Sequence, residues 1–130
     1  MIYGIGTDIV KISRVEKIFK IYGDRFARRI LIIEELSQYH KANDKARFLA
    51  MRFAAKESIT KAMGIGFSKG LRMRDIGIDQ NKSGKPFILF SDNGKKIKEN
   101  LGIGEGYITL SDDYGVAIAF SILMSKSINY

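Results

Sequence analysis

The sequence predicts an α+β fold, in which a mostly antiparallel sheet packs on a long central helix, in a single domain covering residues 1–130. Three observations lead to this prediction. The chain is short for two domains, and its hydrophobic share of 45% is ordinary for a folded chain. A strand pattern opens the chain, helical patterns follow as far as Met63, and strand patterns return after Gly66. This order, with turn sequences between the late strands, favours antiparallel pairing.

The first two elements are a strand and a helix. Residues 2–10, IYGIGTDIV, are predicted as a strand, and Gly4 and Gly6 indicate that something packs close to its backbone. The stretch Ser-Arg-Val-Glu beginning at Ser13 is a capping box, so a helix is expected to start there. Gly23 is a natural C-terminal stop for this helix.

Two further helices are expected before the chain turns to strands. The first covers about residues 33–42, and Asn43-Asp44 interrupts the pattern before a longer helix that runs to Met63. On a helical wheel of residues 48–63, one apolar arc forms the expected core face: Phe48, Met51, Ala55, Ile59, Ala62 and Met63. Glu57 points almost opposite to this arc. Ala50 and Ala54 flank Glu57 on this opposite face, and their small side chains predict an open, shallow surface where a large ligand could lie.

The second half of the chain reads as strands and one short helix. Asp75–Gln80 and Lys85–Phe90 are expected strands joined by a turn. Ser91 can cap a short helix that ends near Leu101. A hairpin is expected from the segments 106–111 and 116–123, with Asp112-Asp113-Tyr114-Gly115 as its turn.

Composition limits the chemistry that the chain can perform. It has no cysteine and one histidine, His40, so thiolate sites and histidine clusters are excluded and any metal would have oxygen ligands. Oxygen ligands favour a hard cation such as Mg²⁺. No apolar run is long enough to cross a bilayer, and no export signal precedes the first strand, so we expect a cytoplasmic protein without a membrane partner.

Basic residues are concentrated near the start of the chain. Residues 11–30 contain seven basic residues and only two acidic ones, within a chain of net charge +8. Such a stretch is either a solvated basic face or a surface for an acidic partner, which could be a nucleic acid, a phosphate ligand or an acidic protein.

Two carboxylates are candidates for a metal site, each with an ordinary alternative. Glu57 and Lys61 have the i,i+4 spacing of a common surface ion pair. Asp8 follows the glycine-rich part of the first strand, where an aspartate often serves a turn or a cap. If they meet, the two carboxylates could hold one Mg²⁺, which keeps several waters and accepts phosphate oxygens.

Three segments carry a family resemblance: MIYGIGTDIV at the start, FAAKESITKAMGIG over residues 53–66, and SGKPFIL over residues 83–89. In order and spacing, with RFARRILIIEEL between them, they resemble the holo-[acyl-carrier-protein] synthase family, the small 4′-phosphopantetheinyl transferases. The resemblance extends over nearly the whole chain. It implies the 4′-phosphopantetheinyl transferase fold and a Mg²⁺-dependent transfer of phosphopantetheine from coenzyme A to a serine of apo acyl carrier protein. The other product is 3′,5′-ADP, and the reaction serves fatty acid biosynthesis.

The resemblance also implies roles for individual residues. Asp8 and Glu57 match the magnesium ligands, and Lys61 matches a lysine that contacts the pyrophosphate and assists proton transfer. The base that deprotonates the carrier's serine is Glu57 or a metal-bound water. Coenzyme A is expected to contact Arg52, Lys61, Gly64, Gly66, Lys85, Pro86 and Ser111. Lys85 and Pro86 would come from a neighbouring subunit of a homotrimer with sites at its subunit interfaces, and the acidic carrier would dock on Arg14, Arg25, Phe26, Arg28 and Arg29.

One position departs from the family pattern. Members usually carry a histidine directly after a late SIS strand, whereas this chain reads TLSD, with Ser111 followed by Asp112. A carboxylate there would repel a polyanionic ligand unless a metal or a lysine offsets it. We therefore expect a somewhat altered nucleotide site.

Two other functions fit part of the sequence. The basic charge permits a small nucleic-acid-binding module without catalysis, although the strands lack the interleaved aromatic and basic residues that RNA-binding sheets use, and we expect no nucleic-acid partner. The chain could also be a relative that binds coenzyme A but has impaired chemistry because of Asp112.

Overall fold

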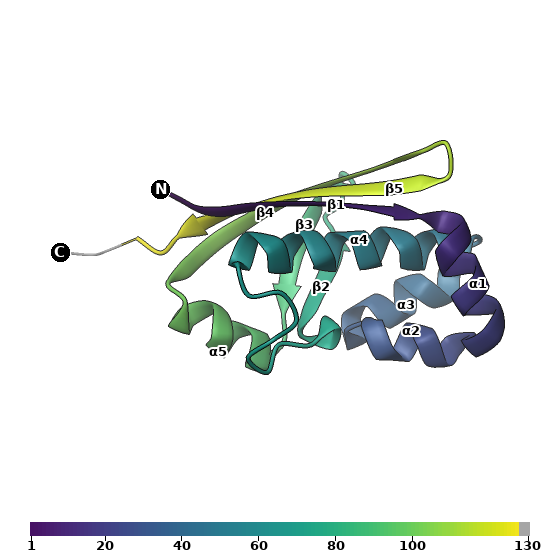
Figure 1. Ribbon diagram of the computed structural model, residues 1–130, viewed down its shortest axis with the longest axis horizontal. Helices are drawn as coiled ribbons and strands as arrows, with labels where there is room; N and C mark the ends of the chain where they lie inside the picture. Colours follow the sequence, from purple (N-terminus) through teal and green to yellow (C-terminus); the bar gives the residue numbers. More distant parts are fainter. Residues whose placement is uncertain (128–130) are drawn as a thin grey trace.

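A long helix under a three-stranded sheet forms the centre of the molecule (Figure 1). The computed structural model describes residues 1–127. The sheet consists of β1 (Ile2–Lys11), β5 (Val116–Ser125) and β4 (Ile103–Asp113), in the order β1-β5-β4, and both pairings are antiparallel. Helix α4 (Lys45–Met63) lies along the inner face of this sheet. The expected α+β class and the packing of the sheet on the long central helix are confirmed.

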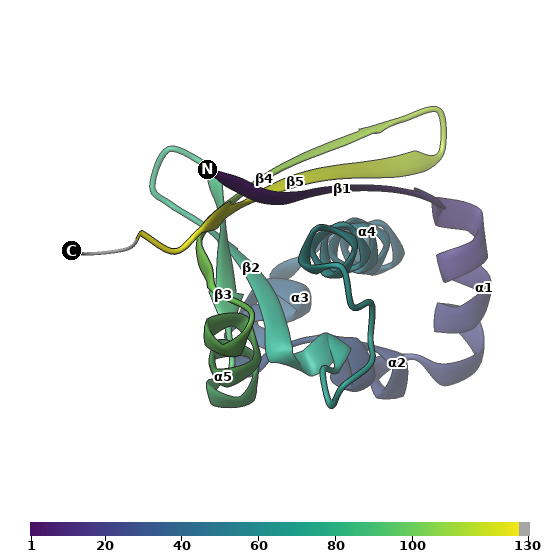
Figure 2. The ribbon, with the colours of Figure 1, turned by 60° about the vertical axis from the view of Figure 1, so that its left-hand side comes forward.

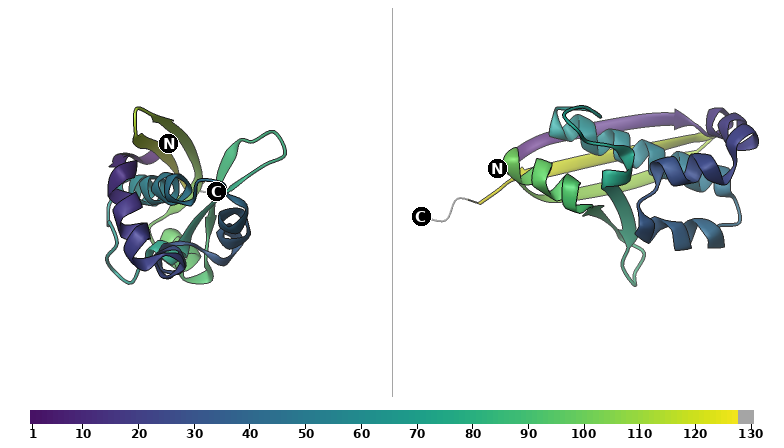
Figure 3. Two further views of the ribbon diagram at one scale, coloured as in Figure 1. Left: turned by 90° about the vertical axis from the view of Figure 1, so that its right-hand side faces the viewer. Right: turned by 90° about the horizontal axis from the view of Figure 1, so that it is seen from below.

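The remaining elements enclose α4 on its other sides (Figure 2). Helix α1 (Ile12–Tyr22) lies on one side, and the two-stranded antiparallel sheet of β2 (Ile76–Gln80) and β3 (Pro86–Phe90) lies on the other. The other four elements are α2 (Asp24–Ile30), α3 (Ile33–Lys41), the 3₁₀ turn η1 (Met73–Asp75) and α5 (Asp92–Asn100). The exposed turn between β2 and β3 projects away from the body (Figure 3).

Two glycines allow β1 and α4 to meet backbone to backbone. A Cβ atom at Gly6 would lie 1.9 Å from the carbonyl oxygen of Ser58, and one at Gly4 would lie 2.0 Å from that of Ala62. No side chain fits at such distances. The close approach predicted from these glycines is therefore present, and the element that approaches is α4.

Helix α4 is buried on more sides than the helical wheel predicts. Ala50 and Ala54 are fully buried, and Arg52 and Lys56 are buried as well, because α4 is covered by β1 and β5, by α1, and by β2 and α3. The expected shallow surface beside Glu57 is absent at these two alanines. Glu57 itself is half-buried.

Several element boundaries differ from the expected ones. Helix α2 was not expected, and α1 begins at Ile12 after Lys11, which makes no side-chain cap, so the capping-box interpretation of Ser13 is wrong. The late hairpin is confirmed, but β4 continues through Asp113. Cross-strand hydrogen bonds extend the ladder into the expected turn.

Other predicted boundaries are confirmed. The side chain of Ser91 caps α5 by accepting a hydrogen bond from the backbone N–H of Gly94 at 3.0 Å. Asp44 does the same for α4, accepting from the N–H of Arg47 at 3.0 Å. Helix α4 ends at Gly64, whose φ of 81° lies in the left-handed region that favours glycine.

The outer face of the three-stranded sheet is apolar and uncovered. Side chains alternate along each strand, so one set faces α4 and the other faces outward. Three cross-strand rows line the outer face: Ile5–Ile122–Tyr107, Thr7–Phe120–Thr109 and Ile9–Ile118–Ser111. In the free chain Ile5 and Ile9 are 60% and 64% exposed, which is unusual for a row of isoleucines.

None of the helices formed by residues 1–127 has the length and apolarity needed to span a bilayer.

Candidate active site

Asp8 lies within β1 on the face that meets α4. Residues 4, 6 and 8 point to the same side of a strand, so the packing of Gly4 and Gly6 against α4 directs Asp8 toward the same helix. Asp8 pairs with Ala119 of β5, three residues before the strand ends. The alternative of a turn or cap aspartate is therefore wrong.

Lys61 connects Asp8 to the helix. Its ammonium group donates hydrogen bonds to Oδ1 of Asp8 at 3.1 Å and to the backbone oxygen of Thr7 at 3.0 Å. Glu57 lies one helical turn before Lys61, on the same side of α4. The lysine thus makes its ion pair across the strand–helix contact with Asp8, and the simple surface pair of Glu57 with Lys61 is not what the structure contains.

The environment of Glu57 disfavours its charged form. Burial raises the pKa of Glu57, the negative charge of Asp8 raises this pKa further, and Lys61 opposes both effects. The two carboxylates lie on either side of Lys61, which contacts Asp8 and follows Glu57 by one helical turn. A cation placed near both would oppose the rise in this pKa.

Asp8 and Glu57 together offer two carboxylates as possible ligands for a metal ion. Among residues 1–127, no three histidine, cysteine, aspartate or glutamate side chains lie together as a metal site. An ion bound by Asp8 and Glu57 would complete its coordination with water and ligand oxygens. Mg²⁺ is commonly bound in this way, by one or two carboxylates together with substrate phosphates.

Lys56, the residue before Glu57, has a different role. It is fully buried, and its ammonium donates to Glu35 Oε1 at 2.6 Å, to the carbonyl of Ile76 at 2.7 Å and to the carbonyl of Ile30. Burial lowers the pKa of Lys56, and Glu35 opposes this shift. Lys56 therefore ties α4 to the end of α2, to α3 and to the start of β2.

Glu35 completes this buried anchor. Its carboxylate also accepts hydrogen bonds from the backbone N–H groups of Ile32 and Ile78, each at 3.0 Å. The sequence alone predicted no role for Lys56 or Glu35. The available signal was a lysine placed directly after three apolar residues, Phe53, Ala54 and Ala55.

The resemblance implied that Arg52 contacts coenzyme A. In the structure, its guanidinium is turned inward and is not placed to hold a phosphate at the surface. Only 5% of the residue is exposed, and its guanidinium lies 3.3 Å from Glu35 and donates to Gln38 at 2.9 Å. It also stacks over the ring of Phe48. A phosphate at the protein surface could reach Arg52 only if these contacts were broken.

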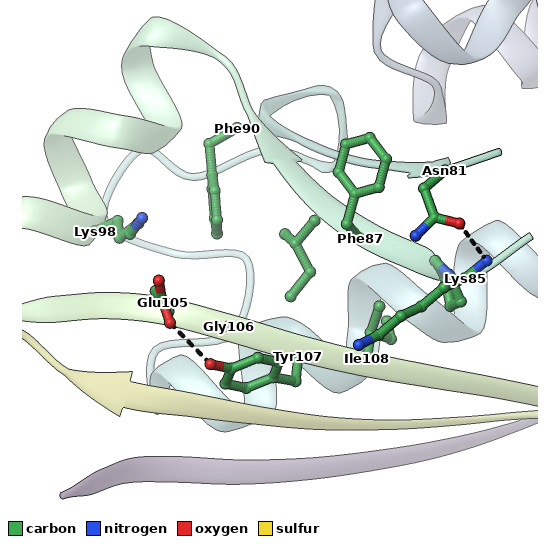
Figure 4. A pocket seen from close by; sticks show the side chains of 11 residues that line it. Asn81, Lys85, Phe87, Phe90, Lys98, Glu105, Gly106, Tyr107 and Ile108 are labelled. Carbon is green, nitrogen blue, oxygen red and sulfur yellow. Dashed lines mark hydrogen bonds between the residues drawn. The ribbon is translucent and has the colours of Figure 1, made fainter. Parts of the chain in front are cut away.

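The other residues assigned to coenzyme A lie in three places. Gly64 and Gly66 follow the end of α4, where both have positive φ and no atom would meet an added Cβ within 4 Å. Lys85 directly precedes β3 and Pro86 begins it, and both line a hollow between β3 and β4 (Figure 4). Ser111 lies on the outer face of β4.

The hollow beside Lys85 lies across the sheet from Asp8. Phe87, Tyr107 and Lys98 also line it, and the hydroxyl of Tyr107 donates to Glu105 at 2.8 Å. Its wall is the edge strand β4, whereas Asp8 belongs to the opposite edge strand β1, with β5 between them. Within one chain, the two groups of predicted residues are therefore separated by the width of the sheet.

Arg47 neutralises the carboxylate of Asp112. Its guanidinium donates two hydrogen bonds to Asp112, at 2.7 and 2.6 Å, and these bonds lower the pKa of the aspartate. The offset that the sequence required from a metal or a lysine is thus supplied by an arginine in the first turn of α4. Nothing in the sequence near Asp112 indicated this partner.

The residues predicted to dock an acidic partner lie on α1 and α2. Arg14 is exposed on α1, and Arg25, Arg28 and Arg29 are exposed on α2. Phe26 is half-buried and packs against the core. Two consecutive helices, α1 and α2, therefore both carry exposed arginines.

Comparison with known proteins identifies the family. The model of the 4′-phosphopantetheinyl transferase superfamily matches residues 4–119. The chain is 43% identical over 123 residues to the holo-[acyl-carrier-protein] synthase of Nitrosospira multiformis, covering 95% of this chain and 98% of the relative. The chain belongs to the holo-[acyl-carrier-protein] synthase family.

Solved structures of family members agree in fold. The crystal structure of the Neisseria meningitidis holo-[acyl-carrier-protein] synthase matches with a TM-score of 0.91 at 39% identity, over 96% of this chain and 100% of that chain. The Helicobacter pylori enzyme, solved in complex with coenzyme A, matches with a TM-score of 0.80 at 33% identity, over 92% and 98% of the two chains. The chain is accordingly an enzyme of the phosphopantetheinyl transferase class.

Proposed function

We propose that Asp8, Glu57 and Lys61 form the reaction centre of this holo-[acyl-carrier-protein] synthase family member. There the chain transfers the 4′-phosphopantetheine group of coenzyme A to a serine of apo acyl carrier protein and releases 3′,5′-ADP, for fatty acid biosynthesis. The observation that carries the assignment is the convergence of two carboxylates and one ammonium group where β1 crosses α4.

Each side chain has a role that its surroundings support. The ammonium of Lys61, more than half exposed, can turn from Asp8 to a pyrophosphate oxygen and stabilise its charge. Glu57 has a raised pKa, so it is a better proton acceptor than an ordinary glutamate and can take the proton of the attacking serine. Asp8, held by Lys61, keeps its oxygens directed toward the same place.

Magnesium fits the donor set of Asp8 and Glu57. When bound, it would supply positive charge that offsets the charge developing on the pyrophosphate. The raised pKa of Glu57 supports this assignment, because a cation near both carboxylates would offset the negative charge of Asp8 that contributes to the shift.

The nucleotide part of coenzyme A is assigned to residues from two copies of the chain. Gly64 and Gly66 would let the ligand approach the backbone at the end of α4, while Lys85, Pro86 and Ser111 would come from a neighbouring copy. The separation of the two groups across the sheet supports this division. The apolar outer face of the sheet supports a homotrimer, since association would cover Ile5, Ile9 and the residues beside them.

The acidic carrier protein is assigned to the exposed arginines of α1 and α2, with Phe26 beneath them. Their charge favours rapid association with an acidic partner and sets its orientation. A cytoplasmic location remains a prediction from the sequence.

A mass-shift assay tests the proposed site. Purified protein is incubated with coenzyme A, Mg²⁺ and apo acyl carrier protein, and the carrier is weighed by mass spectrometry. We expect the carrier to gain the mass of phosphopantetheine with the native chain, and we expect no gain with Asp8→Asn or in the presence of a chelator. Transfer by Asp8→Asn at the native rate would contradict the assignment.

A further inference from the structure

Arginine side chains from two distant segments of the chain meet at one groove. Arg28 and Arg29 belong to α2, whereas Arg72 and Arg74 belong to the N-cap and body of η1. Two hollows of about 650 and 640 Å³ share Arg28, Arg72 and Arg74 in their linings, so they adjoin and form one groove, which we call the arginine groove. All four arginines are exposed.

Apolar side chains also line the arginine groove. Ile33 and Leu36 line one hollow and Phe67 lines the other. Ile33 is 76% exposed in the first turn of α3, although it lies directly after the buried residues Leu31 and Ile32. A row of arginines over an exposed isoleucine is suited to a partner that is acidic on one side and apolar on the other.

A buried aspartate fixes the turn that carries Arg72 and Arg74. Asp75 is 1% exposed and accepts hydrogen bonds from Ser91 at 2.6 Å, from the N–H of Arg72 at 2.8 Å and from Asn93 at 3.0 Å. Burial raises the pKa of Asp75, but these hydrogen bonds outweigh burial and lower it. The two arginines are thus presented by a rigid turn, which reduces the entropy lost when a partner binds.

Positive charge in the arginine groove exceeds the negative charge beside it. Asp75 and Asp92 are the acidic residues among those lining it. The oxygens of Asp75 are already used by the three donors named above, and Arg72 makes only a long contact with it, at 3.5 Å. The positive charge of the arginines in the groove is therefore largely available for an acidic ligand.

We propose that the arginine groove binds a second acidic, amphipathic segment of the carrier protein, separate from the segment that meets α1. This inference rests on the proposed function. The groove continues the basic surface of α2, because Arg28 and Arg29 belong to both. An isolated phosphate would satisfy the arginines but leave Ile33 and Leu36 exposed, whereas an acidic amphipathic helix covers both kinds of residue.

Arg74→Glu tests this inference. Arg74 is exposed on η1, and Lys96→Glu provides a matched control, because Lys96 is exposed on α5 outside the groove and the charge change is the same. Binding of apo carrier protein is measured by calorimetry without coenzyme A, and transfer is measured separately. We expect Arg74→Glu to weaken carrier binding about tenfold and to raise the carrier's KM in proportion, with the KM of coenzyme A unchanged.

A second variant addresses the apolar lining of the groove. Ile33→Ser keeps all four arginines and should fold normally, because the Ile33 side chain is exposed and lies outside the core. We expect it to weaken carrier binding about threefold, because the apolar side of the carrier segment would lose its contact with Ile33. Equal carrier affinity of Arg74→Glu and Lys96→Glu would overturn the inference, as would an equal rise in the KM of coenzyme A. If the native chain transferred nothing while Arg74→Glu still weakened carrier binding selectively, the docking inference would stand and the proposed reaction would fail.

Discussion

At the scale of single residues, the candidate site depends on which charges lie near Glu57. Its pKa is raised by burial and by Asp8, while Lys61 makes its ion pair with Asp8. The charged form of Glu57 is therefore poorly stabilised, and its ionisation lowers the free energy of unfolding of the free chain. Function and stability should therefore respond in opposite directions when this carboxylate is removed.

Glu57→Gln should lose activity and gain stability. Because the folded pKa of Glu57 lies above its unfolded value, ionisation costs stability at pH values above the folded pKa and none below the unfolded pKa, about 4.3. We expect kcat/KM for transfer to fall by at least about 100-fold. In a chelator at pH 7 the variant should have a higher Tm than the native chain, and the difference should disappear as the pH falls toward about 4. A lower Tm at pH 7 would contradict the electrostatic account.

Arg47→Ala should affect coenzyme A more than the carrier. Removing the guanidinium leaves the carboxylate of Asp112 without its partner, and its charge would then repel a phosphate nearby. We expect the KM of coenzyme A to rise about five-fold with the carrier's KM unchanged. The double variant Arg47→Ala/Asp112→Ala is the control and should recover most of the loss; failure to recover would show that Arg47 acts without Asp112.

At the scale of elements, the crossing of β1 and α4 places the site. Gly4 and Gly6 let the two backbones touch, and Asp8 follows them on the same face of the strand. On the helix, Ser58 meets Gly6 while its neighbour Glu57 and Lys61 flank the contact. A small change in this crossing would separate Asp8 from the two helical residues.

Gly6→Ala should therefore disturb both stability and transfer. The added Cβ would lie 1.9 Å from the carbonyl oxygen of Ser58, so α4 must move away from β1. We expect the free energy of unfolding to fall by at least about 2 kcal/mol, measured by urea denaturation. Gly104→Ala is the matched control, since its Cβ would have 3.2 Å to the nearest atom; a fall as large as that of Gly6→Ala would contradict the close-packing argument.

Features of the fold that depend on local backbone geometry could be predicted from the sequence. Glycines at alternate strand positions predicted a close approach, and Ser91 predicted a helix start, because both signals depend on local backbone geometry. The burial of Ala50 and Ala54 could not be predicted from a helical wheel, since that pattern assumes one covered face and α4 is covered on several faces.

Long-range pairs were also beyond the sequence. Arg47 lies 65 positions from Asp112, and Lys56 lies 21 positions from Glu35, so no local spacing connects them. Asp8, Glu57 and Lys61 were predicted to lie together only through the family resemblance. The structure brings Lys61 to Asp8, and Glu57 lies one helical turn before Lys61 on the same side of α4.

At the scale of the whole molecule, the arrangement of exposed groups favours more than one copy. The outer sheet face is apolar, and Lys61 contacts the β1 edge of that sheet whereas Lys85 and Pro86 lie beside its β4 edge. In the proposed homotrimer, the β4 edge of one chain would lie near the β1 edge of another. This would remove the exposed isoleucines and assemble the two groups in one site.

Phe120→Asp tests this association. Phe120 occupies the middle of the outer face, between Thr7 and Thr109, and a charge there cannot be buried without a partner. We expect the variant to be a folded monomer by light scattering, with transfer reduced at least about 100-fold. Tyr114→Asp is the control, because Tyr114 is exposed at the β4–β5 turn and should leave the assembly unchanged. A fully active Phe120→Asp monomer would contradict a site shared between copies.

The most direct test of the central claim is the number of divalent ions that the protein binds through Asp8 and Glu57. Mn²⁺ can replace Mg²⁺ as a probe, and its free concentration is measured by electron paramagnetic resonance during a titration in the presence of coenzyme A. We predict about one bound ion per chain in the native protein, and none at the same concentrations in Asp8→Asn or Glu57→Gln. Native-like Mn²⁺ binding by both variants would contradict the claim that these two carboxylates hold the ion.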